Sequence, residues 1–149
     1  SLGGYYAPRI ASLERRYKAC VAWGAIWDYY ATWEKRIDES FKTELSVPGH
    51  HIEWILNAKT IDEALEKLDG FRLDGVVQKM RCPFLLTHGA DDKQISLKDA
   101  RALYNAVGSK DKTMKVFSVA EGGAQHCQRD NLSIGTTYMF DWLKDKLGA

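Results

Sequence analysis

The sequence contains little of what marks several large classes of protein. Its 149 residues include only three cysteines, an odd number without the spacing of a zinc site, so Cys20, Cys82 and Cys127 are expected to be reduced thiols. The net charge is only +1, and there is no basic cluster and no apolar run of membrane-spanning length. Neither nucleic acid nor a membrane is therefore an expected partner. These absences favour a cytoplasmic protein.

What remains is a chain with enough apolar residues for a packed core, since hydrophobic residues make up 45% of the sequence and aromatic residues 11%. Apolar runs typical of buried strands alternate with segments of helical periodicity, which is the pattern of a parallel sheet flanked by helices. The predicted strands cover 18–24, 83–88 and 113–119, and the predicted helices cover 3–16, 50–57, 61–68, 97–107 and 130–147. The predicted fold class is α/β.

Local signals refine several of these helices. Thr60 and Glu63 have the spacing of a capping box, and Ser96 is expected to cap the helix that follows it. Pro8 is interpreted as lying early enough in the first helix to be tolerated. The last helix is predicted to have one apolar side, formed by Met139, Trp142, Leu143 and Leu147.

The first residues match half of a nucleophile elbow. In the G-x-S-x-G turn, a serine lies between a strand and a helix with its hydroxyl exposed, and Ser1-Leu2-Gly3 fits the second half of that turn. Ser1 would be the nucleophile and the N–H of Leu2 one oxyanion donor, at the positive end of the following helix. The plainer interpretations are an ordinary turn or a cloning remnant.

Two later strands end in the other residues that a serine nucleophile needs. The strand at 83–88 is followed by two aspartates, and the strand at 113–119 by a glycine-rich turn and His126. A serine hydroxyl attacks a carbonyl efficiently only when a base takes its proton, and a buried carboxylate orients that base. The order serine, aspartate, histidine is that of α/β-hydrolases. Considered one at a time, the aspartates could belong to a solvated loop and the histidine to a surface turn.

Asp91 and Asp92 compete for the role of the acid. The α/β-hydrolase pattern H-G-x-x-D-x-x-[VI] can be aligned from His88 to Ile95. This alignment places Asp92 at the acid position, so Asp91 is expected to hydrogen-bond within the turn. His88, at the strand end, is expected to be structural.

The stretch from 25 to 80 lacks strand patterning and lies between two predicted strands, where α/β-hydrolases often carry a helical lid. Its aromatic residues either line a substrate pocket or pack the lid onto the core. The residues assigned to substrate binding are Trp27, Tyr30 and Trp33. The predicted domains are 1–24 (elbow, helix and strand of the core), 25–80 (lid) and 81–149 (the core that carries the acid and the histidine).

Three motifs resemble one subgroup of α/β-hydrolases. They are Ser-Leu-Gly-Gly-Tyr-Tyr-Ala-Pro-Arg at 1–9, Gly-Ala-Asp-Asp at 89–92 and Gly-Gly-Ala-Gln-His-Cys at 122–127. The subgroup includes the 2,6-dihydroxypseudooxynicotine hydrolase of nicotine breakdown and the fungal yellowish-green pigment hydrolases, which shorten a polyketide during melanin synthesis. The resemblance implies that this chain is the C-terminal half of an α/β-hydrolase.

The resemblance also implies a chemistry. Proteins of this subgroup cleave a carbon–carbon bond next to a ketone, and here Ser1, Asp92 and His126 would do so through an acyl-enzyme. No metal or organic cofactor is expected, because the substrate itself stabilises the leaving carbanion. The implied partners are a small-molecule substrate and the N-terminal part of the same protein. Without those N-terminal strands the sheet would expose a long edge, so this chain is not expected to fold stably alone, and a homodimer is one option for its assembly.

Other functions fit parts of the pattern. The same fold carries carboxylesterases and peptidases, and a hydrolase-fold module can be a catalytically silent binding module. Ser1 could instead be an N-terminal nucleophile with its own α-amine as base, but the β-rich pattern expected for such proteins is absent. Cys127 would need a base of its own to act as a nucleophile, and because none is evident it is interpreted as a packing residue.

Overall fold

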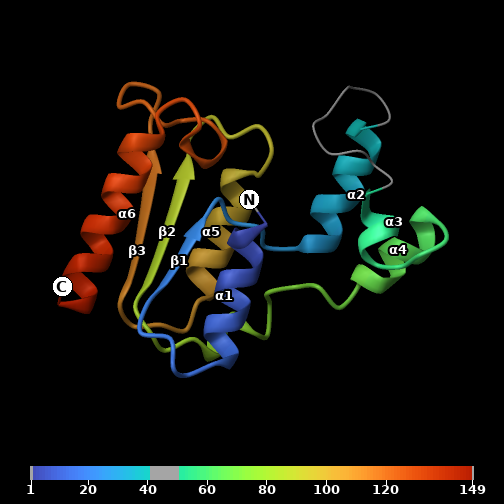
Figure 1. The fold of residues 1–149 in the computed structure, drawn as a ribbon, viewed down its shortest axis with the longest axis horizontal. Coiled ribbons are helices and arrows are strands. Elements are labelled where there is room, and N and C mark those ends of the chain that lie inside the picture. Colours follow the sequence, from blue (N-terminus) through green and yellow to red (C-terminus); the bar gives the residue numbers. More distant parts are fainter. Residues whose placement is uncertain (1, 41–50, 149) are drawn as a thin grey trace. The chain divides into compact units, whose positions relative to one another are not determined.

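The computed structural model describes residues 2–40 and 51–148, with strands and helices alternating along the chain (Figure 1). The elements are α1 Gly3–Leu13, β1 Cys20–Trp23, α2 Tyr29–Ser40, α3 His51–Ile55, α4 Ile61–Leu68, η1 Val77–Lys79, β2 Phe84–Gly89, α5 Leu97–Ala106, β3 Lys112–Phe117, η2 His126–Gln128 and α6 Leu132–Leu147. Within these described ranges, no helix is long and apolar enough to cross a membrane.

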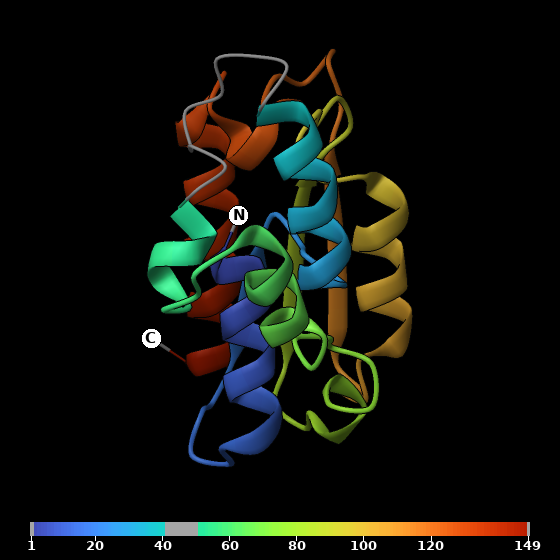
Figure 2. The ribbon, with the colours of Figure 1, turned by 90° about the vertical axis from the view of Figure 1, so that its right-hand side faces the viewer.

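The strands form a parallel sheet in the order β1-β2-β3, which confirms the predicted α/β class. All six residues of β2 are buried, as expected for a central strand of a parallel sheet that is covered on both faces. On one face, Met139 and Trp142 of α6 pack against Leu85. Figure 2 shows α5 on the opposite side of the sheet from α6.

The chain divides into two compact units. The first contains residues up to Trp27 and from Leu73 onward, and the second contains Asp28–Arg72, inserted between β1 and β2. The chain passes between the units at 27–28 and at 72–73. Backbone hydrogen bonds join the residues beside these two points, from Leu73 N to the Trp27 carbonyl at 3.2 Å and from Tyr29 N to the Phe71 carbonyl at 3.0 Å. The second unit is narrower than the predicted lid range of 25–80.

Helix α2 was not predicted from the sequence, and helices α1 and α6 differ from their predictions. Helix α1 ends at Leu13 rather than at 16, and Pro8 is its sixth residue, so the proline lies in the helix interior. A proline there donates no backbone hydrogen bond, and the helix is held instead by packing, with Tyr5 fully buried. In α6, Met139 and Trp142 are buried, whereas Leu147 is 52% exposed.

Candidate active site

The loop after β2 is joined through its backbone to the end of β3 and to the loop that follows β3. Ala90 N donates to the Phe117 carbonyl and Asp91 N to the Ala124 carbonyl, both at 2.9 Å. Gly89 permits this approach, because a Cβ at that position would lie 2.1 Å from the Ala124 carbonyl oxygen. The glycine of the H-G-x-x-D pattern is therefore required by the close packing of one loop against the other.

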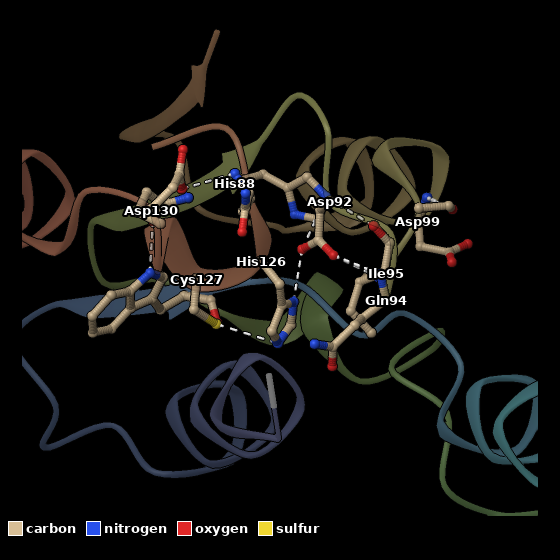
Figure 3. Close-up of polar contacts among 12 residues, drawn as sticks. His88, Asp92, Gln94, Ile95, Asp99, His126, Cys127 and Asp130 are labelled. Carbon is tan, nitrogen blue, oxygen red and sulfur yellow. Dashed lines mark hydrogen bonds and ion pairs between the residues drawn. The ribbon is translucent and has the colours of Figure 1, made fainter. Parts of the chain in front are cut away.

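These loops bring Asp92 and His126 together. Nδ1 of His126 donates to Oδ2 of Asp92 at 2.8 Å, and the side chains are 11% and 1% exposed, respectively. The other carboxylate oxygen, Oδ1, accepts from the backbone N–H groups of Gln94 at 2.8 Å and Ile95 at 3.0 Å (Figure 3). Asp92 is thus oriented by the turn that follows it, and it orients the ring.

The hydrogen bonds of this pair outweigh the effect of burial. Burial by itself raises the pKa of Asp92, but the hydrogen bonds from His126 and from the backbone of Ile95 lower that pKa below its ordinary value. Burial by itself lowers the pKa of His126, but its interactions with Asp92 and Cys127 raise that pKa to about 9. The pair therefore favours an ionised carboxylate beside an imidazolium.

The neighbouring candidates have other contacts. Asp91 forms an ion pair with Lys93 and its side chain is half-exposed, so of the two adjacent aspartates only Asp92 lies within hydrogen-bond distance of His126. His88 is fully buried, its Nε2 lies 3.1 Å from the Ile95 carbonyl oxygen, and burial lowers its pKa. This environment fits the structural role expected for His88.

The loop that carries His126 has an unusual backbone. Gly122 and Gly123 have φ values of 80° and 76°, and the non-glycine residues Cys127 and Gln128 both have φ values of 50°. Left-handed values are costly for side chains with a Cβ, so the surrounding structure must hold them. Oε1 of the fully buried Gln128 accepts from Nε1 of Trp23 at 2.6 Å and anchors the loop to the end of β1.

Asp130 shapes the same loop from its other end. Its two carboxylate oxygens accept from the backbone N–H groups of Ala124 and Gln125, each at 3.0 Å. Neither Asp130 nor Gln128 was singled out from the sequence. An aspartate four residues after the histidine is a weak signal, because aspartates that bond nearby backbone groups are common in turns.

The structure corrects the interpretation of Cys127. Its Sγ lies 3.5 Å from Nε2 of His126 and 3.6 Å from the Trp23 carbonyl oxygen. A base is therefore in reach, whereas the sequence interpretation found none. The contact occurs in the turn η2, where Cys127 has a left-handed backbone with φ 50° and ψ 34°.

The start of α1 approaches the same end of β1. Ser1 lies outside the described residues, and Leu2 is the N-cap of α1, without a side-chain hydrogen bond that caps the helix. Gly4 touches the residue that follows β1, because a Cβ on Gly4 would lie 1.7 Å from the Gly24 carbonyl oxygen. The first turn of α1 and the thiol of Cys127 therefore meet consecutive residues at this end of β1.

The three aromatic residues assigned to substrate binding lie in different settings. Trp27 belongs to the first unit, and Tyr30 and Trp33 to the second. Trp33 is 3% exposed and packs edge-on against Tyr29, with ring centroids 6.3 Å apart. The hydroxyl of Tyr30 lies 3.5 Å from Oε1 of Glu34. The structure thus assigns Trp33 to the packing of the second unit, and substrate contact by the three rings stays a prediction.

The surroundings of His126 suit proton transfer. Among the residues that the structure describes, no group of three or more histidine, cysteine, aspartate or glutamate side chains is arranged to hold a metal ion. A depression of about 180 Å³ lies beside His126, and polar side chains line it: Asp91, Lys93, Gln94, Gln125 and Arg129. The imidazole can exchange a proton with a group placed near its Nε2.

The sequence is similar to those of known hydrolases. No family model matches the chain. The chain is 29% identical to the 2,6-dihydropseudooxynicotine hydrolase of Paenarthrobacter nicotinovorans, over all of this chain and 37% of that protein. It is 25% identical to Hydrolase LUC6 from a Fusarium species, over 99% of this chain and 42% of that protein. The chain therefore spans about 40% of the length of these curated relatives.

A solved structure supports the same relationship. The crystal structure of the 2,6-dihydroxy-pseudo-oxynicotine hydrolase superposes with a TM-score of 0.73 and 26% sequence identity, over 98% of this chain and 38% of that one. Parallel strands flanked by helices, loops that bring an aspartate to a histidine, and this match all agree. The chain is therefore the C-terminal part of an α/β-hydrolase fold and resembles the subgroup that contains this hydrolase.

Proposed function

We propose that the chain carries the acid, the base and the nucleophile of a serine hydrolase, with Asp92, His126 and Ser1 in these roles. The observation that carries the proposal is the hydrogen bond of 2.8 Å from His126 Nδ1 to the buried carboxylate of Asp92. A buried carboxylate on Nδ1 fixes the tautomer and leaves Nε2 to accept the proton of a nucleophile. The approach of α1 to the end of β1, which the thiol of Cys127 also contacts, supports Ser1 as that nucleophile.

The first half of the reaction forms an acyl-enzyme. His126 takes the proton of the Ser1 hydroxyl at Nε2, and the serine oxygen adds to a carbonyl carbon of the substrate. The N–H of Leu2, at the start of α1, donates to the oxyanion, and the positive end of the helix favours the negative charge. Asp92 stabilises the imidazolium that forms meanwhile.

The bond that breaks next defines the reaction class. In a 1,3-diketone or an acyl-aromatic ketone, the tetrahedral intermediate collapses by releasing a carbanion, which leaves as an enolate or an electron-rich ring carbon. The imidazolium of His126 gives its proton to that carbon. Water, deprotonated by His126, then attacks the acyl-enzyme and releases a carboxylic acid and Ser1. No metal or organic cofactor is required for these steps, since the substrate carries the charge.

Support for a ketonic substrate comes from resemblance. The motifs at 1–9, 89–92 and 122–127 resemble those of a subgroup associated with carbon–carbon cleavage, and one relative is named for a pseudooxynicotine. Polyketides and acyl-aromatic ketones are the substrate class that we infer. Trp27, Tyr30 and Trp33 remain candidates for contacts with such rings, since aromatic side chains commonly line pockets for apolar ligands.

The test is a Ser1→Ala variant of the full-length protein. Ser1→Ala should lower kcat by about 10⁴-fold or more, because the nucleophile is lost while the fold is kept. In the unaltered protein, a fluorophosphonate probe should attach to the peptide that contains Ser1, as peptide mass mapping can show. If the folded Ser1→Ala variant retained turnover, Ser1 would not be the nucleophile. A catalytically silent binding module would show neither turnover nor a fluorophosphonate adduct.

A matched pair of substrates separates the reaction classes. A carboxylesterase on the same fold would use the same three residues on an ester. We expect a 1,3-diketone or acyl-aromatic ketone to give a higher kcat/KM than a simple aryl ester of similar size. The reverse preference would keep the serine mechanism and reject carbon–carbon cleavage.

A further inference from the structure

The proposed mechanism leaves one reactive group unused. Cys127 is partly buried, and its Sγ lies 3.5 Å from Nε2 of His126, the ring nitrogen that does not face Asp92. Figure 3 shows Asp92 and Cys127 on the two sides of the His126 ring. A thiol, an imidazole and a buried carboxylate thus form a continuous chain of contacts, in the order that activates cysteine nucleophiles in other proteins.

The position of this thiol is held by the surrounding structure. Cys127 and Gln128 both have φ values of 50°, and such a backbone persists only where its neighbours fix it. The hydrogen bond of 2.6 Å from Trp23 Nε1 to Gln128 Oε1 supplies one anchor. The contact of 3.6 Å from the thiol to the Trp23 carbonyl supplies another. The thiol and the imidazole are therefore held together by the loop.

The other two cysteines provide an internal comparison. Burial raises the pKa of Cys20 to about 12 and also raises the pKa of Cys82. At Cys127, burial alone would raise the pKa, but the hydrogen bond with His126 and its charge lower it. The thiolate is the reactive form of cysteine, and only Cys127 lies beside a group that stabilises it.

We propose that Cys127 is a modification site for peroxides, and that its oxidised form blocks the base His126. The sulfur of Cys127, having passed its proton to His126, attacks one oxygen of hydrogen peroxide and breaks the O–O bond. The sulfur is oxidised by two electrons to a sulfenic acid. The released hydroxide takes the proton from the imidazolium and becomes water.

The product adds an oxygen to a sulfur that already touches His126. The sulfenic acid fills the space beside Nε2, where the proposed function requires a nucleophile or a leaving group to exchange a proton. Hydrolysis should therefore stop while the oxygen is present. Sulfenic acids are reduced by thiols, so the block should be reversible. The modification itself depends only on the Cys127–His126 geometry, whereas the loss of hydrolysis also rests on the proposed function.

The experiment treats the full-length protein with hydrogen peroxide at pH 7 in the presence of dimedone, which traps sulfenic acids. Peptide mass mapping then follows Cys20, Cys82 and Cys127 in one sample. We expect Cys127 to gain the adduct at least about tenfold faster than Cys82, since one pKa unit changes the thiolate fraction about tenfold. Without dimedone, hydrolysis should fall with the oxidised fraction and return after dithiothreitol is added.

Variants test the cause of the reactivity. His126→Gln should slow adduct formation at Cys127 to the rate of Cys82, a measurement that needs no catalytic activity. The hydrolytic activity that the Cys127→Ala variant retains should not fall on treatment with peroxide. The matched control, Cys82→Ala, should lose activity on the same treatment, as the unaltered protein does.

Three results would be decisive against parts of this account. Equal rates at Cys127 and Cys82 would overturn the modification site. Full hydrolysis by protein oxidised at Cys127 would overturn the block of His126. A protein that forms the Cys127 adduct selectively but never hydrolyses a substrate would keep the site and reject the proposed function instead.

Discussion

The loops at the sheet end and the inserted helical unit are held in different ways. The loops of the first region, residues 89–96 and 121–131, are joined by the backbone hydrogen bond from Asp91 N to the Ala124 carbonyl, beside a glycine with no room for a Cβ. The second region, residues 28–72, also has backbone hydrogen bonds, such as the one from Tyr29 N to the Phe71 carbonyl. It adds ring packing of Tyr29 on Phe71, at 6.1 Å between centroids, and an exposed ion pair between Lys67 and Glu63. Exposed pairs contribute little stability. The difference is that the loops beside Asp92 and His126 have no room for an added Cβ at Gly89, whereas Gly70 of the second region has free space around it.

The largest expected effect is on the chemistry of the first region. Asp92→Asn should lower kcat by about 10⁴-fold, as expected when the carboxylate that orients a catalytic histidine is replaced by an amide. The matched control is Asp91→Asn in the same turn, which should change kcat by less than about threefold, since solvent-exposed groups contribute little. Steady-state kinetics on the full-length protein measure both. Similar losses in the two variants would contradict the assignment of Asp92 as the acid.

The next effect compares the backbones of the two regions. Gly89→Ala should destabilise the full-length protein by about 3 kcal/mol or more, because the new Cβ would lie 2.1 Å from a carbonyl oxygen. Gly70→Ala, in the second region, meets nothing within 4 Å and should change the free energy of unfolding by less than about 0.5 kcal/mol. Urea titrations measure both values. If Gly89→Ala proved as stable as Gly70→Ala, the loops would not be fixed as described.

The pH dependence of kcat/KM tests the raised pKa of His126. The ring acts as a base only when neutral, and it is neutral above its pKa, which its partners raise to about 9. The value of kcat/KM should therefore rise with pH, with a midpoint near that value rather than near the ordinary 6.5. Cys127→Ala removes one cause of the shift and should move the midpoint down by about one unit. Cys82→Ala should leave it in place, and a profile unchanged by Cys127→Ala would show that the thiol does not affect the ring.

The smallest effect is one that the two regions should share. Thr60 caps α4 in the second region and Ser96 caps α5 in the first, each accepting a hydrogen bond from a backbone N–H three residues on. Replacing either by alanine should cost about 1 kcal/mol of unfolding free energy. A cap acts on its own helix, so thermal melts should give similar losses. A much larger loss at Ser96 would mean that the cap also supports the neighbouring Asp92 turn.

The candidate site was predictable from the sequence where its residues obey local rules. The spacing from His88 to Ile95 selected Asp92, and the structure places the Asp92 carboxylate on the Ile95 N–H and on His126. The contact of Cys127 was not predicted, and it occurs in a loop with a left-handed backbone at this non-glycine residue, which no local sequence rule indicates. The setting of Trp33 could not be predicted either, since a ring that lines a pocket and a ring that packs a helix follow the same periodicity.

The sequence by itself determined the α/β class, the strands that precede Asp92 and His126, and the caps at Thr60 and Ser96. These features depend on the period of hydrophobic residues and on hydrogen bonds between residues close in the chain, so a local sequence pattern is enough to predict them. Only the tertiary structure decided that a thiol joins the Asp92–His126 pair and that the insertion spans Asp28–Arg72. Cys127 and His126 are adjacent in sequence, but the contacts that hold their loop join distant residues, 34 positions apart for His126 and Asp92 and 104 for Cys127 and Trp23. The packing of the whole chain fixes such contacts, and no local pattern encodes them.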